Sequence, residues 1–138
     1  MANKVIAVSG GFDPVHVGHV RMIQHASEYG DVIVIANSDS WLMRKKGYVF
    51  MPFEERREIL SAFKGVTGVV EAHDDDNTVC KSLEIINPDA FANGGDRKRE
   101  NTPEMNLCRG MGIDLLWNIG GEKIQSSSDL VASTKEKS

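Results

Sequence analysis

The chain has 138 residues, of which 41% are hydrophobic and 26% are charged, and its formal net charge is −4. This length is enough for one compact domain with its own core, and the composition is ordinary for a globular protein. The acidic balance argues against a protein that coats nucleic acid, but it is compatible with a local positive site for a small anion.

The N-terminal segment contains one lysine and a short apolar run. A secretory signal would need a longer apolar segment before its cleavage site. No apolar run approaches the ~20 residues that a membrane span requires. Cys80 and Cys108 both lie in segments of helical character, and two thiols favour a reduced protein over a disulfide scaffold. We therefore expect a cytoplasmic protein without a membrane span.

Apolar runs rich in β-forming residues alternate along the chain with segments of helical spacing. The predicted strands are residues 4–9, 31–38, 68–73, 89–93 and 113–119. The predicted helices are residues 17–29, 53–63, 78–86, 102–109 and 126–134. Residues 41–51 contain three consecutive cations and fit no regular element, so we expect a long, mobile loop there. Residues 1–132 would form a single domain, followed by a frayed tail at 133–138.

This alternation predicts a doubly wound, Rossmann-like α/β fold, in which helices cover both faces of a five-stranded parallel sheet. In the strand order 3-2-1-4-5, the order reverses between the first and fourth strands, and ligands bind outside the carboxyl ends at such a point. Glycine-rich turns follow both strands, with Gly10, Gly11, Phe12 and Asp13 after the first and Gly94, Gly95 and Asp96 after the fourth. We expect the two turns to face each other across one crevice.

The sequence HVGH, residues 16–19, places two histidines three positions apart just after the first turn. If a helix begins near Val17, His16 lies at its cap and His19 lies on the same side one turn later. Gly18 would let a ligand approach the backbone, and the helix N-terminus suits a phosphate. Zinc would need further ligands, and no companion pair has suitable spacing, so no metal site is predicted. Two ordinary surface histidines are the structural alternative.

Other polar segments allow both a functional and a structural interpretation. The cations Arg44, Lys45 and Lys46 could clamp a triphosphate or form a solvated loop. The acidic run at 74–76 could attract Mg²⁺ or cap the next helix. The serines at 126–128 could hold phosphates or cap the last helix. Neither GxxxxGK[ST] nor GxGxxG occurs in the chain, so these two nucleotide-binding motifs lack support.

In combination, the motifs resemble those of the cytidylyltransferase-like nucleotidyltransferases. The HxGH signature of that family matches residues 16–19, and its second signature, an isoleucine before small hydroxyl residues, resembles residues 124–128 (IQSSS). The segments between them follow in the same order: Asn37-Ser38-Asp39, Lys46-Gly47, residues 52–56 and Gly94-Gly95-Asp96. Within the family, the chain resembles the glycerol-3-phosphate cytidylyltransferases and, slightly more closely, the heptose-phosphate adenylyltransferase domains.

The resemblance implies transfer of a nucleoside monophosphate from CTP or ATP to a small phosphorylated sugar or polyol, with release of pyrophosphate. Positioning and charge neutralisation would carry catalysis, and Mg²⁺ would accompany the triphosphate. The family also implies a homodimer. Gly11 and Gln125 replace family side chains, which motivates an alternative, a nucleotide-binding sensor module without catalysis. A metal-dependent hydrolase that uses the histidine pair is a further alternative.

The resemblance also implies roles for individual residues. His16 and His19 would contact the triphosphate, with His19 near the α-phosphate in the transition state. Lys46, or Lys45 one position earlier, would neutralise phosphate charge, and Arg56 would contact the phosphates or the acceptor. The other implied nucleotide-binding positions are Gly10, Gly11, Phe12, Asp13, Gly18, Asp96, Ile124, Gln125, Ser126 and Ser127.

Overall fold

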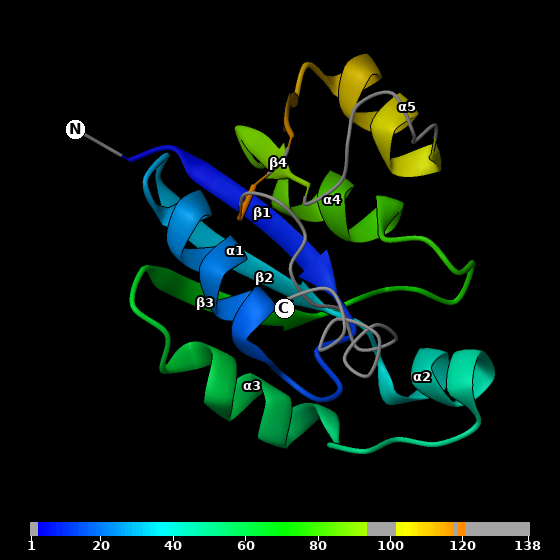
Figure 1. Ribbon diagram of the computed structural model, residues 1–138. Helices are drawn as coiled ribbons and strands as arrows, with labels where there is room; N and C mark the ends of the chain where they lie inside the picture. The colour runs from blue at the N-terminus through cyan, green and yellow to red at the C-terminus, as the bar shows by residue number, and fades with distance from the viewer. Residues whose placement is uncertain (1–2, 94–101, 118, 121–138) are drawn as a thin grey trace, which may run out of the picture.

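Five parallel strands form one sheet in the order β3-β2-β1-β4-β5, as the sequence predicted. The computed structural model describes residues 3–93, 102–117 and 119–120 (Figure 1). The strands are β1 (Val5–Gly10), β2 (Asp31–Ala36), β3 (Val66–Glu71), β4 (Ala90–Ala92) and β5 (Asp114–Leu116). The helices are α1 (Val17–Ser27), α2 (Asp39–Lys46), α3 (Phe53–Ser61), α4 (Cys80–Ile86) and α5 (Pro103–Met111).

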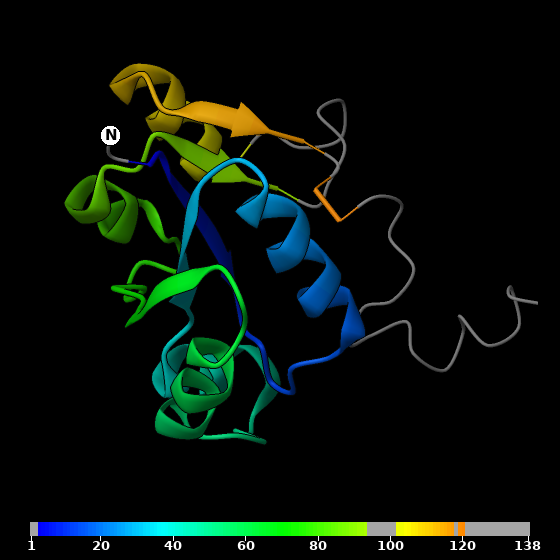
Figure 2. The same cartoon turned by 90° about the vertical axis from the view of Figure 1, so that its left-hand side faces the viewer.

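Helices cover both faces of this sheet. Successive residues of a strand point to opposite faces, so Ile6 and Val8 of β1 pack on one face with residues of α1 and α3, whereas Ala7 packs on the other face with residues of α4 and α5. Figure 2 shows α1 and α4 on opposite sides of the strands. The fold is therefore the doubly wound, Rossmann-like α/β arrangement that the alternation of elements predicts. None of the helices within the described ranges is both long and apolar enough to cross a membrane.

One prediction is wrong: most of the expected loop at 41–51 is the helix α2, which lies beyond the tips of β1 and β2 (Figure 1). Ser38 caps the helix, since its Oγ accepts a hydrogen bond from the Trp41 amide at 3.0 Å. Three cations in the last turn suit the negative end of the helix dipole, and Gly47 ends the helix with a φ of 85°. Only Leu42 is fully buried, so the sequence carries little apolar periodicity there.

The other differences are small. β3 begins two residues before its predicted start, and β5 occupies only the first half of its predicted range. The predicted last helix and the predicted tail lie outside the described residues, as does the turn after β4 with Asp96. The described part of the candidate site therefore consists of the carboxyl ends of β1, β2 and β3 and of the connections that follow these strands.

Candidate active site

The turn after β1 is tightly packed. Phe12 is 2% exposed and adopts a positive φ of 54°. A Cβ atom added to Gly10 would lie 3.2 Å from the Phe12 ring, and one added to Gly11 would lie 3.4 Å from Leu42 of α2. These glycines therefore let the turn close onto its own aromatic ring and onto α2. Their predicted contacts with a nucleotide stay predictions.

The histidine pair begins α1 with a reciprocal cap. The Nδ1 atom of His16 accepts a hydrogen bond from the Gly18 amide, and the Nδ1 atom of His19 accepts one from the His16 amide, both at 3.1 Å. This is a capping box in which imidazoles replace the usual Ser/Thr and Glu/Gln side chains. The two rings stack with centroids 3.9 Å apart, and Phe12 contacts the His19 ring edge-on at 4.6 Å. The rings are thus held in place before any ligand binds.

The cap also fixes where each imidazole carries its proton. A backbone N–H can only donate, so both Nδ1 atoms are acceptors and the proton of each neutral ring is on Nε2. Burial lowers the pKa of His16, and burial together with the neighbouring His16 lowers the pKa of His19 to about 4. At neutral pH, each ring therefore offers one Nε2–H donor. Such an arrangement suits an anion that accepts hydrogen bonds.

The depressed pKa values predict a dependence of stability on pH. An unfolded histidine binds a proton below pH 6.5, whereas folded His19 stays neutral down to about pH 4. The unfolded state thus holds more protons in this window, so the free energy of unfolding should fall by up to about 3 kcal/mol as the pH drops through it. Urea denaturation at several pH values measures this. His19→Asn, which cannot titrate, should flatten the profile, and an unchanged profile would contradict the assignment.

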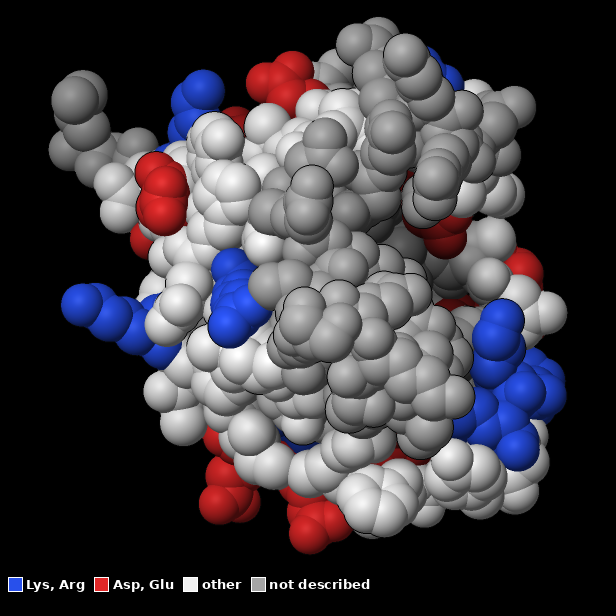
Figure 3. Space-filling view, in the orientation of Figure 1, with Lys and Arg blue, Asp and Glu red and all other residues white. Residues whose placement is uncertain are grey.

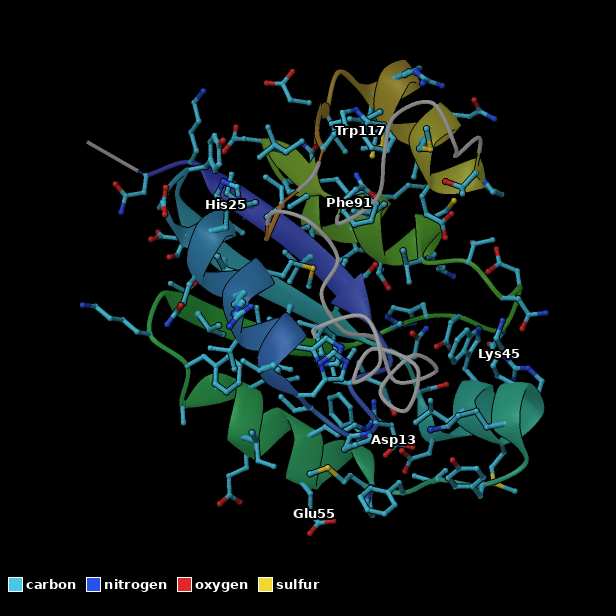
Figure 4. The ribbon with its side chains drawn as sticks, viewed as in Figure 1. Asp13, His25, Lys45, Glu55, Phe91 and Trp117 are labelled. Atoms are coloured by element: carbon cyan, nitrogen blue, oxygen red, sulfur yellow. The ribbon has the colours of Figure 1, made fainter. Side chains whose placement is uncertain are left out.

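Asp13 organises the connection between α2 and α3. Its buried carboxylate accepts hydrogen bonds from Lys46 Nζ and the Phe50 amide, each at 2.8 Å, and from the Met51 amide. Burial alone would raise the pKa of Asp13, but the hydrogen bonds from Lys46 and the two amides outweigh it and hold the pKa below 3.8. Figure 4 shows Asp13 in the region where the turn after β1 approaches α2 and α3. The structure thus brings together Asp13 and Lys46, which were predicted separately as site residues, and Lys46 Nζ also lies 4.7 Å from the centre of the Tyr48 ring.

Arg56 is fully buried, at 0% exposure, although the sequence predicted a contact with phosphates or the acceptor. Its guanidinium donates to the carbonyls of Gly11, Asn37 and Met51 at 2.7–2.9 Å and to Asp39 Oδ1 at 2.7 Å. These bonds join the turn after β1, the end of β2 and the connection before α3. The structure thus gives Arg56 a supporting role, and its contact with a substrate stays a prediction.

The sequence did not single out the supporting role of Asp74. Its buried carboxylate accepts hydrogen bonds from Asn37 Nδ2, the Ser38 amide and Ser38 Oγ, at 2.6–3.0 Å. The carboxylate therefore fixes the residue that caps α2. The only sign of this role in the sequence was the run of three acids directly after the predicted third strand. The buried acid of that run, Asp74, binds protein groups that lie 36 and 37 positions earlier in the chain.

The structure describes some of the remaining predicted site residues and not others. Gly18 takes part in the cap through its amide, and Lys45 lies on exposed α2 with its Nζ 5.7 Å from the centre of the Trp41 ring. Asp96, Ile124, Gln125, Ser126 and Ser127 lie outside the described residues. In the part of the chain that the structure describes, no group of three or more His, Cys, Asp or Glu side chains could hold a metal ion.

Comparison with known proteins finds relatives in sequence and a solved structure with the same fold. The chain is 35% identical over 112 residues to Bifunctional protein HldE of Hahella chejuensis, which covers 79% of this chain and 23% of that protein. It is 35% identical over 136 residues to Bifunctional protein HldE of Citrifermentans bemidjiense, which covers 90% of this chain and 28% of that protein. The chain thus spans about a quarter of the length of these relatives.

A solved structure shares the fold. The lipopolysaccharide core biosynthesis protein from Thermoplasma volcanium superimposes with a TM-score of 0.66 at 22% identity, over 83% of this chain and 93% of that one. The model of the family described as cytidylyltransferase-like matches residues 7–112, which include the turn after β1, both histidines, Lys46 and Arg56. The chain belongs to the cytidylyltransferase-like family of nucleotidyltransferases.

Proposed function

We propose that the chain transfers a nucleoside monophosphate from CTP or ATP to a small phosphorylated sugar or polyol and releases pyrophosphate. The observation that carries the proposal is the pair of neutral imidazoles at the start of α1, whose Nδ1 atoms are both bound by backbone amides. Membership of the cytidylyltransferase-like family and the HldE relatives support the class of reaction.

In this reaction, an oxygen of the acceptor's phosphate attacks the α-phosphorus, and the bond between that phosphorus and the pyrophosphate oxygen breaks. Negative charge builds up on the α-phosphate oxygens and on the departing pyrophosphate. The Nε2–H groups of His16 and His19 would donate hydrogen bonds to these oxygens, in a geometry fixed beforehand by the cap. Lys46 would contribute its positive charge at the same edge of the sheet, on exchanging part of its contact with Asp13 for phosphate.

Mg²⁺ is proposed to enter with the triphosphate, whose phosphate oxygens are the hard ligands that this ion prefers. The ion would supply charge neutralisation on the phosphates. The carboxylate nearest to Lys46, Asp13, already accepts three hydrogen bonds, so we assign it to support of the loop. We also propose a homodimer from the family resemblance, which light scattering on the eluted protein would test.

Pyrophosphate release measured with each of the four common nucleoside triphosphates, in combination with glycerol 3-phosphate and a set of monosaccharide phosphates, tests the function. We expect turnover with CTP or ATP and with at least one acceptor. A folded protein that binds the magnesium nucleotide but turns over no pair would contradict the proposal, and would favour the sensor module suggested by Gly11 and Gln125.

A further inference from the structure

The helix α2 carries the lysine that is proposed to act on the triphosphate, yet apolar packing holds this helix weakly. Among its eight residues, all of which the structure describes, Leu42 alone is fully buried. A helix of this length is marginal in water by itself, so contacts with other segments must keep α2 in place. Lys46 stands in the last turn, where its Nζ donates to Asp13 Oδ2 at 2.8 Å. The position of Lys46 at the candidate site therefore depends on what anchors α2.

The carboxylate of Asp74 anchors the beginning of α2. Its Oδ2 atom accepts hydrogen bonds from the Asn37 side chain at 3.0 Å and from the Ser38 amide at 2.9 Å, and its Oδ1 atom accepts one from Ser38 Oγ at 2.6 Å. Because the Ser38 hydroxyl directs its proton to Asp74, its lone pairs are available to the Trp41 amide, which donates to it at 3.0 Å. The buried carboxylate thus orients the hydroxyl that caps α2.

The connection after β3 also holds the end of α2. Arg44 Nη2, in the last turn of the helix, donates to the backbone carbonyl of Asp74 at 2.8 Å and to Asn77 Oδ1 at 3.2 Å. The Asn77 amide donates to the same Asp74 carbonyl at 2.9 Å, which closes the connection into a turn. Figure 3 shows the cationic side chains gathered at the surface over α2. Asp74 therefore contacts α2 twice, through its carboxylate at the cap and through its carbonyl in the last turn.

Asn37 joins this anchor to the turn after β1. Its backbone amide donates to the Gly10 carbonyl at 2.9 Å, and its side-chain amide donates to Asp74. Asp13, the partner of Lys46, follows Gly10 by three positions in the chain. The anchor of α2 and the segment that carries Asp13 are therefore tied to each other, and this arrangement places Lys46 beside the turn after β1.

We infer that Asp74 is a positioning residue for the triphosphate: through Ser38 and the helix α2, it keeps Lys46 at the candidate site. The inference rests on the proposed function, in which Lys46 neutralises charge on the triphosphate. Asp74 has this role without touching the substrate. Its two oxygens already accept three hydrogen bonds from the protein, so we assign the carboxylate to the scaffold and not to a metal ion.

A double-mutant cycle tests whether Asp74 acts through Lys46. Asp74→Asn keeps the size of the side chain but replaces one acceptor oxygen by an amide group, which cannot accept the hydrogen bond from Ser38 Oγ. We expect it to raise the dissociation constant of the bound magnesium triphosphate, CTP or ATP, about tenfold in calorimetry. In a Lys46→Ala background, the same substitution should change this constant within about twofold, because the group that it positions is gone.

Three further variants complete the cycle. In a His19→Asn background, Asp74→Asn should keep its effect of about tenfold, since His19 lies on α1 and not on α2. Ser38→Ala removes the same hydrogen bond from the other side and should give the pattern of Asp74→Asn. Asp75→Asn removes an equal charge from the exposed neighbouring position and is the matched control, which should leave the dissociation constant unchanged.

Hydrogen exchange of the protein without nucleotide gives a readout that does not depend on binding. Asp74→Asn should raise the exchange rates of the amides in α2 about tenfold and leave those of α1 unchanged, because the lost anchor acts locally. An equal rise in all helices would show a loss of overall stability, and would overturn the positioning role.

The outcomes separate this inference from the proposed function. If Asp74→Asn weakens binding equally with and without Lys46, or no more than Asp75→Asn does, the inference is overturned, whereas turnover by the wild type would still uphold the function. Wild-type protein that binds neither triphosphate would overturn both. The expected cycle without any release of pyrophosphate would uphold the positioning role and contradict the enzymatic function, since calorimetry does not depend on catalysis.

Discussion

Replacement of His19 by asparagine should lower the rate of pyrophosphate release by about 10²–10³-fold and leave the start of α1 in place. The amide oxygen of asparagine can occupy the position of Nδ1 and accept the hydrogen bond from the His16 amide. No group would replace the Nε2–H donor. Loss of a single donor that acts on developing charge costs a factor of this size in other enzymes. His16→Asn should behave in the same way, because asparagine is also a good helix cap.

The measurement compares kcat and the midpoint of urea denaturation for each variant. His25→Asn is a matched control on the same helix, because the Nδ1 atom of His25 also accepts a backbone hydrogen bond, from Gly120 at 2.8 Å. This control should keep nearly the full rate. His19→Ala removes both the cap and the donor, so it should lose stability in addition to activity. If His19→Asn keeps its rate within a few-fold, the histidine pair is only a helix cap, and the proposed chemistry is wrong.

The sequence predicted the features that depend on neighbouring residues. The buried strands β1 and β2 are nearly continuous apolar runs, and their alternation with helices specifies the parallel sheet. The start of α1 was predicted from HVGH and the turn before it. The mutual cap of the two imidazoles was not predicted, because histidine is an unusual capping residue. The protonated nitrogen of each ring follows only from that cap.

The sequence could not predict features that depend on distant contacts. Arg56 follows two acids, a pattern that is typical of an exposed helix face, yet its partner Gly11 lies 45 positions away in the chain. The helix α2 escaped prediction because a single leucine anchors it, while its cap depends on Asp74. The different surroundings of Lys45, near the Trp41 ring, and of Lys46, paired with Asp13, also needed the structure, since adjacent residues on a helix point in different directions.

Arg56→Ala should lower the free energy of unfolding by about 3–5 kcal/mol, because it removes a fully buried guanidinium that satisfies several polar groups at once. The substitution leaves three carbonyls and the partly exposed Asp39 without their donor. Such a loss is a large part of the 5–15 kcal/mol that is typical of a whole domain. Urea denaturation measures this loss, provided that the m-value is the same for the variant and the wild type. Arg57→Ala, next in the chain but exposed and paired with Glu54, should cost less than about 1 kcal/mol.

Arg56→Lys separates support of the scaffold from contact with substrate. Lysine keeps the charge but cannot reach three segments at once with a single ammonium group, so this variant should be destabilised less than Arg56→Ala. If Arg56 only supports the site, the KM values of the folded variant should change little, and kcat should fall because the turn with Asp13 and the start of α2 lose their common anchor. A selective rise in the KM for the triphosphate or the acceptor would instead support the predicted substrate contact. Equal stability of Arg56→Ala and Arg57→Ala would show that the buried guanidinium does not stabilise the junction of these segments.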